Sequence, residues 1–279
     1  MGRLWRAAVI GAFAVVAPGT FAIAADMPEP PVYTPPPPAH FGGWYLRGYI
    51  GMTNQKLGEL DNVLFDTTDE LVIHTKNFES GITFGGGIGY EFNEWFRTDF
   101  TAEYRGEVGF HGFDTWTDED GDPRFNNYTA KKSEWLFLAN AYVDMGTYYG
   151  VTPYLGAGIG ASYNTIHSFR DEGIEYETPN DLDSGVPTMA YAADHGEWNL
   201  AWALHAGMSF KATKNLTIDV GYSFLNLGDA QTGDIIGFDG SNTIDNPMHF
   251  NDIISHDVKL GFRWSFDQPD YYEPAVVKY

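Results

Sequence analysis

The feature that most constrains this 279-residue chain is a two-residue alternation of apolar and polar side chains that recurs in eight segments. Because successive side chains of a β-strand point to opposite faces, the alternation predicts strands with one apolar face. Between Phe96 and Phe110, for example, apolar or small residues interleave with mostly charged ones. The predicted strands lie at 44–52, 82–92, 96–110, 134–144, 155–162, 200–209, 218–224 and 257–266.

The connections between these strands alternate in length. Those at 93–95, 147–151 and 212–215 are short, whereas those at 53–79, 111–131, 165–197 and 227–253 are long. Long loops therefore gather at one end and short turns at the other, and strands of roughly 9–11 residues suffice to cross a bilayer when tilted. The predicted fold is all-β: an eight-stranded antiparallel transmembrane β-barrel with four long extracellular loops and short periplasmic turns.

A soluble β-sandwich would satisfy the same alternation, with its apolar faces in a core. Large aromatic residues near the strand ends favour the barrel, because such residues form girdles at membrane interfaces. These aromatic residues are Trp44, Phe92, Phe96, Trp198, Phe210, Trp264 and Phe266.

The segments that flank the strands predict export. Residues 1–24 combine a basic start, an apolar run and Ala22-Ile23-Ala24, as a secretory signal peptide does. Prolines then predict an extended periplasmic linker over 25–43, followed by the outer-membrane β-barrel at 44–266 and a periplasmic tail at 267–279.

Composition excludes several classes of function. The absence of cysteine removes disulfide frameworks, thiolate zinc sites and thiol nucleophiles. A net charge of −22 argues against any nucleic-acid partner, because a phosphate backbone would be repelled. We predict no cofactor, no metal site and no catalytic residue. His256 and Ser255 are adjacent and so point to opposite faces, and the histidines at 74, 111, 167, 195 and 249 fall in long loops without a shared spacing.

The faces opposite the apolar ones carry charges of both signs, which in a barrel would meet in the lumen. An unpaired buried charge costs several kcal/mol, whereas opposite charges neutralise one another. Eight strands leave an interior just wide enough for side chains, so we predict a packed polar lumen without an open channel. The predicted lumen ionic network comprises Arg47, Glu91, Arg97, Asp99, Glu103, Arg105, Glu107, Asp144, Asp219, Asp257, Lys259 and Arg263.

Two stretches carry a family resemblance. Residues 43–48, GWYLRG, and the closing residues 255–266, SHDVKLGFRWSF, resemble the alphaproteobacterial outer-membrane surface antigens of the opacity-like, OmpA-type family. The resemblance implies an eight-stranded barrel, outer-membrane location and roles in envelope integrity or host contact. Family members commonly end at a terminal Phe that the barrel-insertion machinery reads. Here the chain continues past Phe266, so the implied insertion signal, Phe262, Trp264 and Phe266, is internal.

The four long loops hold 24 of the 38 acidic residues and 5 of the 16 basic ones. We therefore expect an outer-membrane surface protein that supports envelope integrity and surface contact through acidic loops. Its expected partners are outer-membrane lipid and lipopolysaccharide, the barrel-insertion machinery and divalent cations at the loops. The alternatives are a lipid A-modifying enzyme and a small-conductance porin.

Overall fold

The computed structural model describes residues 42–65, 68, 70–178 and 181–266, all within one compact unit, Pro38–Tyr279. The predicted signal peptide, most of the linker and the predicted tail lie outside the described residues. Among the described residues, no helix is long and apolar enough to cross a membrane.

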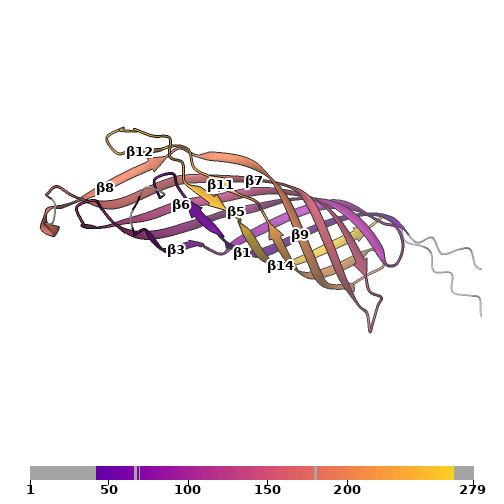
Figure 1. Cartoon of the computed structure of the whole chain (residues 1–279). Helices are drawn as coiled ribbons and strands as arrows, with labels where there is room; N and C mark the ends of the chain where they lie inside the picture. The colour runs from indigo at the N-terminus through magenta and orange to yellow at the C-terminus, as the bar shows by residue number, and fades with distance from the viewer. Residues whose placement is uncertain (1–41, 66–67, 69, 179–180, 267–279) are drawn as a thin grey trace, which may run out of the picture. The chain divides into compact units, whose positions relative to one another are not determined.

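Eight antiparallel strands close into a barrel (Figure 1). Each strand pairs with the next along the chain, and the last returns to pair with the first, with Tyr45 opposite Ser265. Closure leaves none of the eight with an unpaired edge inside the membrane. The barrel strands are β1 (Gly43–Lys56), β4 (Gly81–Glu91), β5 (Phe96–Thr117), β6 (Pro123–Asp144), β7 (Val151–Tyr176), β9 (His195–Lys211), β10 (Leu216–Asn226) and β14 (Ile254–Ser265).

Three of these strands are much longer than the sequence predicts. β5 and β6 have 22 residues each and β7 has 26, so segments expected to be loops at 111–131 and 165–176 are largely strand. β3 (Val72–Phe78) and β8 (Gly185–Ala192) pair with the extended parts of β5 and β7, and β12 (Ile235–Gly237) pairs with β8. A short 3-10 turn, η2 (Leu182–Ser184), precedes β8. The end that carries these extensions is called the loop end, and the end with the short turns is called the turn end.

A second, small sheet lies at the loop end. It is formed by β2 (Glu59–Asp61), β13 (His249–Asn251) and β11 (Ala230–Gln231), in the order β11-β13-β2. Phe250 of β13 pairs with Leu60 on one side and with Ala230 on the other, and all three are buried. Segments predicted as the first and last long loops therefore fold together over the barrel.

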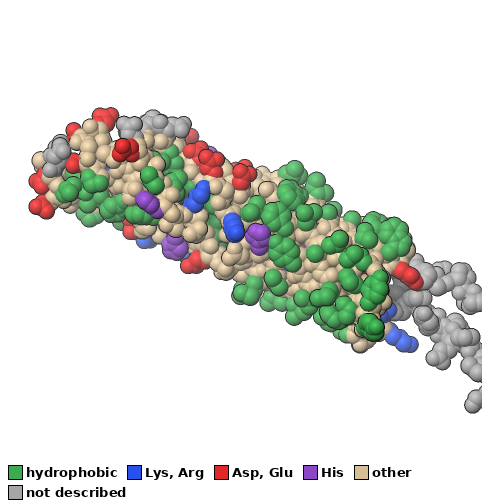
Figure 2. Space-filling view, turned by 60° about the horizontal axis from the view of Figure 1, so that its bottom comes forward, with side chains coloured by type: hydrophobic (Ala, Val, Ile, Leu, Met, Phe, Trp, Pro, Cys, Tyr) green, Lys and Arg blue, Asp and Glu red, His purple; other side chains and the backbone are tan. Residues whose placement is uncertain are grey.

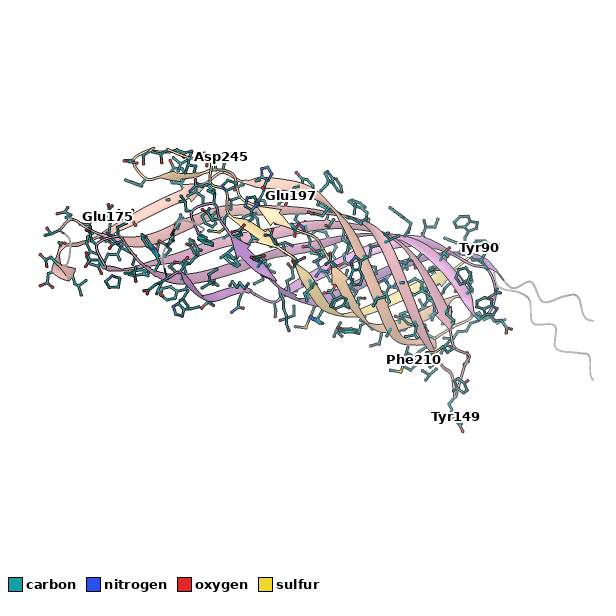
Figure 3. The ribbon with its side chains drawn as sticks, in the orientation of Figure 1. Tyr90, Tyr149, Glu175, Glu197, Phe210 and Asp245 are labelled. Carbon is teal, nitrogen blue, oxygen red and sulfur yellow. The ribbon has the colours of Figure 1, made fainter. Side chains whose placement is uncertain are left out.

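The outward faces of the barrel strands form an apolar belt that occupies the turn-end part of the barrel (Figure 2). Two rows of aromatic rings border this belt. The outer row joins Phe84, Tyr104, Trp135, Phe137, Trp198 and Tyr163, with successive ring centroids 5.0–6.2 Å apart. The inner row includes Trp44, Tyr90, Phe92 and Phe96, at 5.0–5.5 Å. Figure 3 shows Tyr90 and Phe210 at the turn end, with Glu175 and Asp245 at the loop end.

A β-bulge in β5 reverses the alternation just above the outer aromatic row. The pairing of β5 with β6 shifts register between Arg105 and Val108. As a result Glu107, expected in the lumen, lies outside and is half exposed, where it pairs with Lys131 at 2.6 Å. Val108 and Phe110, expected outside, are buried in the interior. The sequence prediction was wrong for these three residues because one extra residue moves all later side chains to the opposite face.

Candidate functional site

The lumen contains two groups of ion pairs, one above the other. In the group near the turn end, Arg47 pairs with Asp99 at 2.7 Å and Arg263 with Asp219 at 2.9 Å. Arg263 also reaches Glu91 at 2.9 Å. These lower ion pairs join strands β1, β4, β5, β10 and β14, so they tie together elements that are distant in the sequence.

Arg97 in the same layer is held partly by aromatic rings. Its Nε donates to Asp144 at 3.1 Å, while the carbon centre of the guanidinium lies 4.1 Å from the ring centroid of Tyr142 and 4.9 Å from that of Tyr154. The two terminal nitrogens are buried and have no hydrogen-bond acceptor. Contact with the faces of electron-rich rings partly compensates for the missing acceptors.

The second group is centred on Arg105, which is fully buried. Its guanidinium lies 2.9 Å from Glu103, 2.5 Å from Glu134 and 2.6 Å from Asp257. Two lysines complete the group: Lys132 pairs with Glu134, and Lys259 lies 2.5 Å from Glu103. The three cations and three carboxylates of these upper ion pairs balance, as a desolvated cluster requires.

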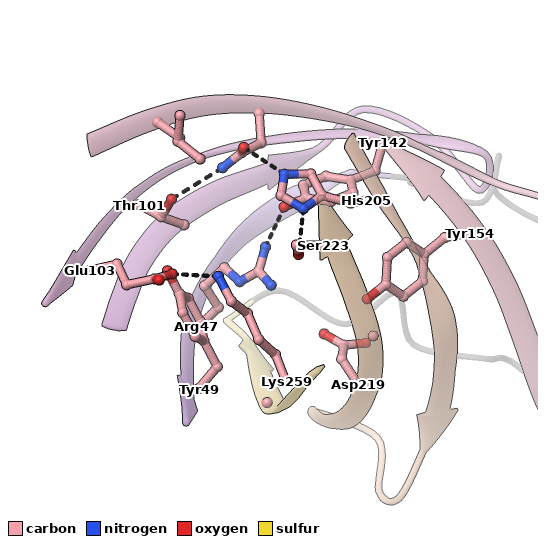
Figure 4. A pocket seen from close by; sticks show the side chains of 14 residues that line it. Arg47, Tyr49, Thr101, Glu103, Tyr142, Tyr154, His205, Asp219, Ser223 and Lys259 are labelled. Atoms are coloured by element: carbon pink, nitrogen blue, oxygen red, sulfur yellow. Dashed lines mark hydrogen bonds and ion pairs between the residues drawn. The ribbon is translucent and has the colours of Figure 1, made fainter. Parts of the chain in front are cut away.

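A small cavity separates the two groups (Figure 4). His205 lies beside it, where its Nε2 donates to Asn140 Oδ1 at 3.1 Å and its Nδ1 is hydrogen-bonded to the Ser223 hydroxyl at 2.9 Å. The cavity measures about 30 Å³, which is room for one or two water molecules. Inward-facing glycines leave room for the large side chains that fill the lumen. A β-carbon on Gly85, for example, would lie 2.6 Å from the Tyr49 hydroxyl. The lumen is therefore packed with side chains rather than open.

An apolar plug covers the upper ion pairs. Phe110 packs edge-to-face on Phe250 at 4.8 Å and lies 5.2 Å from Phe78, and all three are buried. The Lys132 ammonium lies 5.9 Å from the Phe78 ring, so the plug rests directly on the charged layer. Leu60, Met248 and Ile253 complete the plug.

Beyond the plug, a cavity of about 630 Å³ lies against the inner face of the extended strands. Asp171 of β7 lines it, and its Oδ1 is buried without a hydrogen-bond partner. Burial, with the nearby carboxylates of Asp114 and Glu172, raises the pKa of Asp171 to about 7. The pKa of Asp114 is also raised by burial, although it accepts hydrogen bonds from Tyr128 at 2.6 Å and Asn126 at 3.1 Å.

The structure brings together all the residues of the predicted lumen network except Glu107. The sequence prediction omitted two members of the network, Lys132 and Glu134. Both lie on the inward face of β6, so counting Glu134 and then continuing the alternation two residues towards the N-terminus would have found them. The predicted insertion-signal residues Phe262, Trp264 and Phe266 lie outward on or beside β14 and are about half exposed.

The comparison with known proteins identifies the family. A model described as outer membrane protein beta-barrel domain matches residues 32–266. The chain belongs to this family. Membership and the apolar belt together place the protein in the outer membrane.

Individual proteins are also similar to this chain in sequence or in fold. A protein of Brucella suis biovar 1 (strain 1330) is 33% identical over 283 residues, covering 88% of this chain and 93% of the relative. Outer membrane protein PagN of Salmonella typhimurium is 28% identical over 160 residues, covering 52% of this chain and 58% of PagN. OprG from Pseudomonas aeruginosa, a solved outer membrane protein, is 12% identical, with a TM-score of 0.44, and the alignment covers 81% of this chain and 98% of OprG.

Proposed function

We propose that this outer-membrane barrel acts through its loop end, as a surface protein that supports envelope integrity and surface contact, and not as a diffusion pore. The observation that carries the proposal is the combination of a filled lumen with a structured, acidic loop end.

The filled lumen argues against a porin. A solute would have to pass the lower ion pairs, the upper ion pairs and the apolar plug in turn. Opening this path means breaking buried ion pairs such as Arg105–Asp257, which costs several kcal/mol for each group left unpaired. We expect no stepwise conductance in planar-bilayer recordings of the purified protein, and stable open-channel steps would contradict the closed lumen.

The loop end is suited to contact outside the membrane. β5, β6 and β7 continue past the outer aromatic row as a paired sheet, so the acidic residues lie on an ordered surface (Figure 2). Exposed carboxylates such as Glu119, Asp120 and Glu175 attract divalent cations, which would bridge them to lipopolysaccharide phosphates. The barrel-insertion machinery is the proposed partner of Phe262, Trp264 and Phe266 during assembly.

A deletion strain tests the integrity role. We expect it to become more sensitive to detergent and EDTA, and wild-type protein to restore resistance. A variant with E119Q, D120N and E175Q should restore it only in part, whereas E94Q at the turn end, a matched exposed carboxylate, should restore it fully. Full rescue by the triple variant would reject cation bridging, and a deletion strain without an envelope defect would reject the integrity role.

A further inference from the structure

A serine, a histidine and an aspartate form a connected chain on the outer surface of the barrel. The Ser133 hydroxyl lies 2.9 Å from His167 Nε2, and His167 Nδ1 lies 3.3 Å from Asp194 Oδ2. The residues come from β6, β7 and the connection between β8 and β9. The order of atoms is that of an acyl-transfer triad, with the hydroxyl on Nε2 and the carboxylate on Nδ1.

The contacts fix the roles of the three groups. An ionised carboxylate only accepts hydrogen bonds, so Asp194 requires the proton of neutral His167 to be on Nδ1. Nε2 is then free to accept the proton of the Ser133 hydroxyl. Hydrogen bonds from the Ser168 backbone and from His167 lower the pKa of Asp194, which keeps it ionised.

The backbone is strained where it holds the aspartate. Ser168 has a φ of 51°, in the left-handed region that non-glycine residues rarely adopt, and its N–H donates to Asp194 Oδ1 at 3.0 Å. The register of β7 against β6 shifts at this point, between Lys131 and Thr129. Strain of this kind persists only where surrounding structure enforces it, and it concentrates at functional sites. The bulge directs the Ser168 N–H to the carboxylate that orients His167.

The position of Ser133, His167 and Asp194 relative to the apolar belt indicates the class of substrate. On the outward face of β6, Ser133 is followed towards the belt by Trp135, which lies in the outer aromatic row beside Tyr163 and Trp198. The hydroxyl is therefore at the height where the acyl chains of the outer leaflet meet their polar headgroups. The partly exposed His167 and exposed Asp194 leave the group open to water from the outside.

We propose that Ser133, His167 and Asp194 hydrolyse fatty-acyl esters of outer-leaflet lipids. This activity goes beyond the proposed surface role and can fail independently of it. Ser133 Oγ attacks the ester carbonyl carbon while His167 Nε2 takes the hydroxyl proton. The tetrahedral intermediate collapses, the ester C–O bond breaks, and His167 returns the proton to the departing lipid alkoxide. Water then attacks the acyl-serine, gives its proton to His167, and releases the fatty acid as Ser133 regains its hydroxyl proton.

Active-site labelling tests the nucleophile without knowledge of the natural lipid. The full-length mature protein, folded in detergent micelles, is treated with a long-chain alkyl fluorophosphonate, and the labelled peptide is identified by mass spectrometry. We expect label on Ser133, no label in S133A and slower labelling in H167Q and D194N. The matched controls are S80A and H111Q, which alter another surface serine and another ion-paired surface histidine. Absence of label on Ser133, or unchanged labelling in H167Q, would overturn the proposal.

Fatty-acid release distinguishes the two lipid sources of the ester. Lipopolysaccharide and phosphatidylethanolamine, each in mixed micelles, are incubated with the protein, and free fatty acid is measured by mass spectrometry. We expect release from one of them that falls by a factor of at least about 1,000 in S133A and H167Q, as for other triads. Release that S133A does not change would assign it to a contaminant and reject the proposal, as would no release from either lipid.

Discussion

Arg105 on β5 donates to both carboxylate oxygens of Asp257 on β14, at 2.6 Å and 3.0 Å, across 152 residues of sequence. Both side chains are fully buried, so the pair joins two walls of the barrel in a place from which water is excluded. Bidentate geometry of this kind is the strongest form of arginine–carboxylate pairing.

Replacing Arg105 with Met should strongly destabilise the barrel. The substitution removes the partner of Asp257, Glu103 and Glu134, and buried carboxylates that lose their cation cost about 3–5 kcal/mol. Urea unfolding in micelles measures the change. The control K131M breaks an ion pair of similar length on the exposed surface and should cost less than about 1 kcal/mol. Equal losses in the two variants would contradict the importance of the upper ion pairs.

A charge placed on the apolar belt should impair membrane insertion. Leu204 is exposed on the outward face of β9, between the two aromatic rows. L204R should cost about 2–4 kcal/mol of folding free energy in phospholipid vesicles, because the guanidinium would face hydrocarbon. M189R on β8, at another exposed side chain but beyond the belt, should change stability by less than about 0.5 kcal/mol. If both variants fold equally well in vesicles, the assigned belt is wrong.

The apolar plug should depend on Phe110. F110A removes a fully buried ring that contacts Phe78 and Phe250, and such truncations cost about 3–5 kcal/mol. F113A, on the opposite face of the same strand, should cost much less because its side chain is only partly buried. Hydrogen exchange of β3 and β13 in the two variants would separate these effects, and similar exchange rates would count against a cooperative plug.

The extended strands at the loop end should lose stability as pH rises from about 4 to 7. The pKa of Asp171 is about 7 in the folded protein against an ordinary value of 3.8, so the folded state holds a proton that the unfolded state has released. Stability therefore falls through this window, by up to about 4 kcal/mol, and is constant above it. The groups that affect this carboxyl include Asp114 and Glu172, and Tyr128 lies opposite Asp171 in the ladder.

Hydrogen exchange of β6 and β7 at pH 5 and pH 8 measures this effect. D171N should remove most of the difference, whereas D239N, in an exposed loop, should leave it unchanged. An equal pH dependence in wild type and D171N would show that another group is responsible.

The membrane-spanning part of the fold could be predicted because lipid imposes the pattern. Where the outer face must be apolar and the lumen must balance charge, Phe100 and Asp99 can be assigned to opposite sides from sequence alone. Above the aromatic rows water bathes the outside, so polar residues are tolerated on both faces and the pattern fades. The extended parts of β5–β7 were therefore expected to be loops.

The remaining errors have local causes. A bulge after Arg105 sends Glu107 outward. Gly106 lies at the shift, but glycines such as Gly85 and Gly87 also occur in a strand without a bulge, so the residue type alone did not reveal it. Ser133, His167 and Asp194 were missed for a different reason: their separations, 34 and 27 residues, acquire meaning only when β6, β7 and the β8–β9 connection are placed side by side.

The bulges at residues 106–107 and at Ser168 lie at the height where the interior changes. On the turn-end side, called the stem, the interior is filled by ion pairs; on the loop-end side, called the head, it begins with the aromatic rings of the apolar plug. The ion pairs of the stem join residues of the stem to one another, so its charges do not depend on side chains of the head for neutralisation. Insertions or exchanges in the 118–122 turn would then alter what the cell displays while leaving the anchoring stem intact, which makes this turn a suitable site for grafting foreign epitopes.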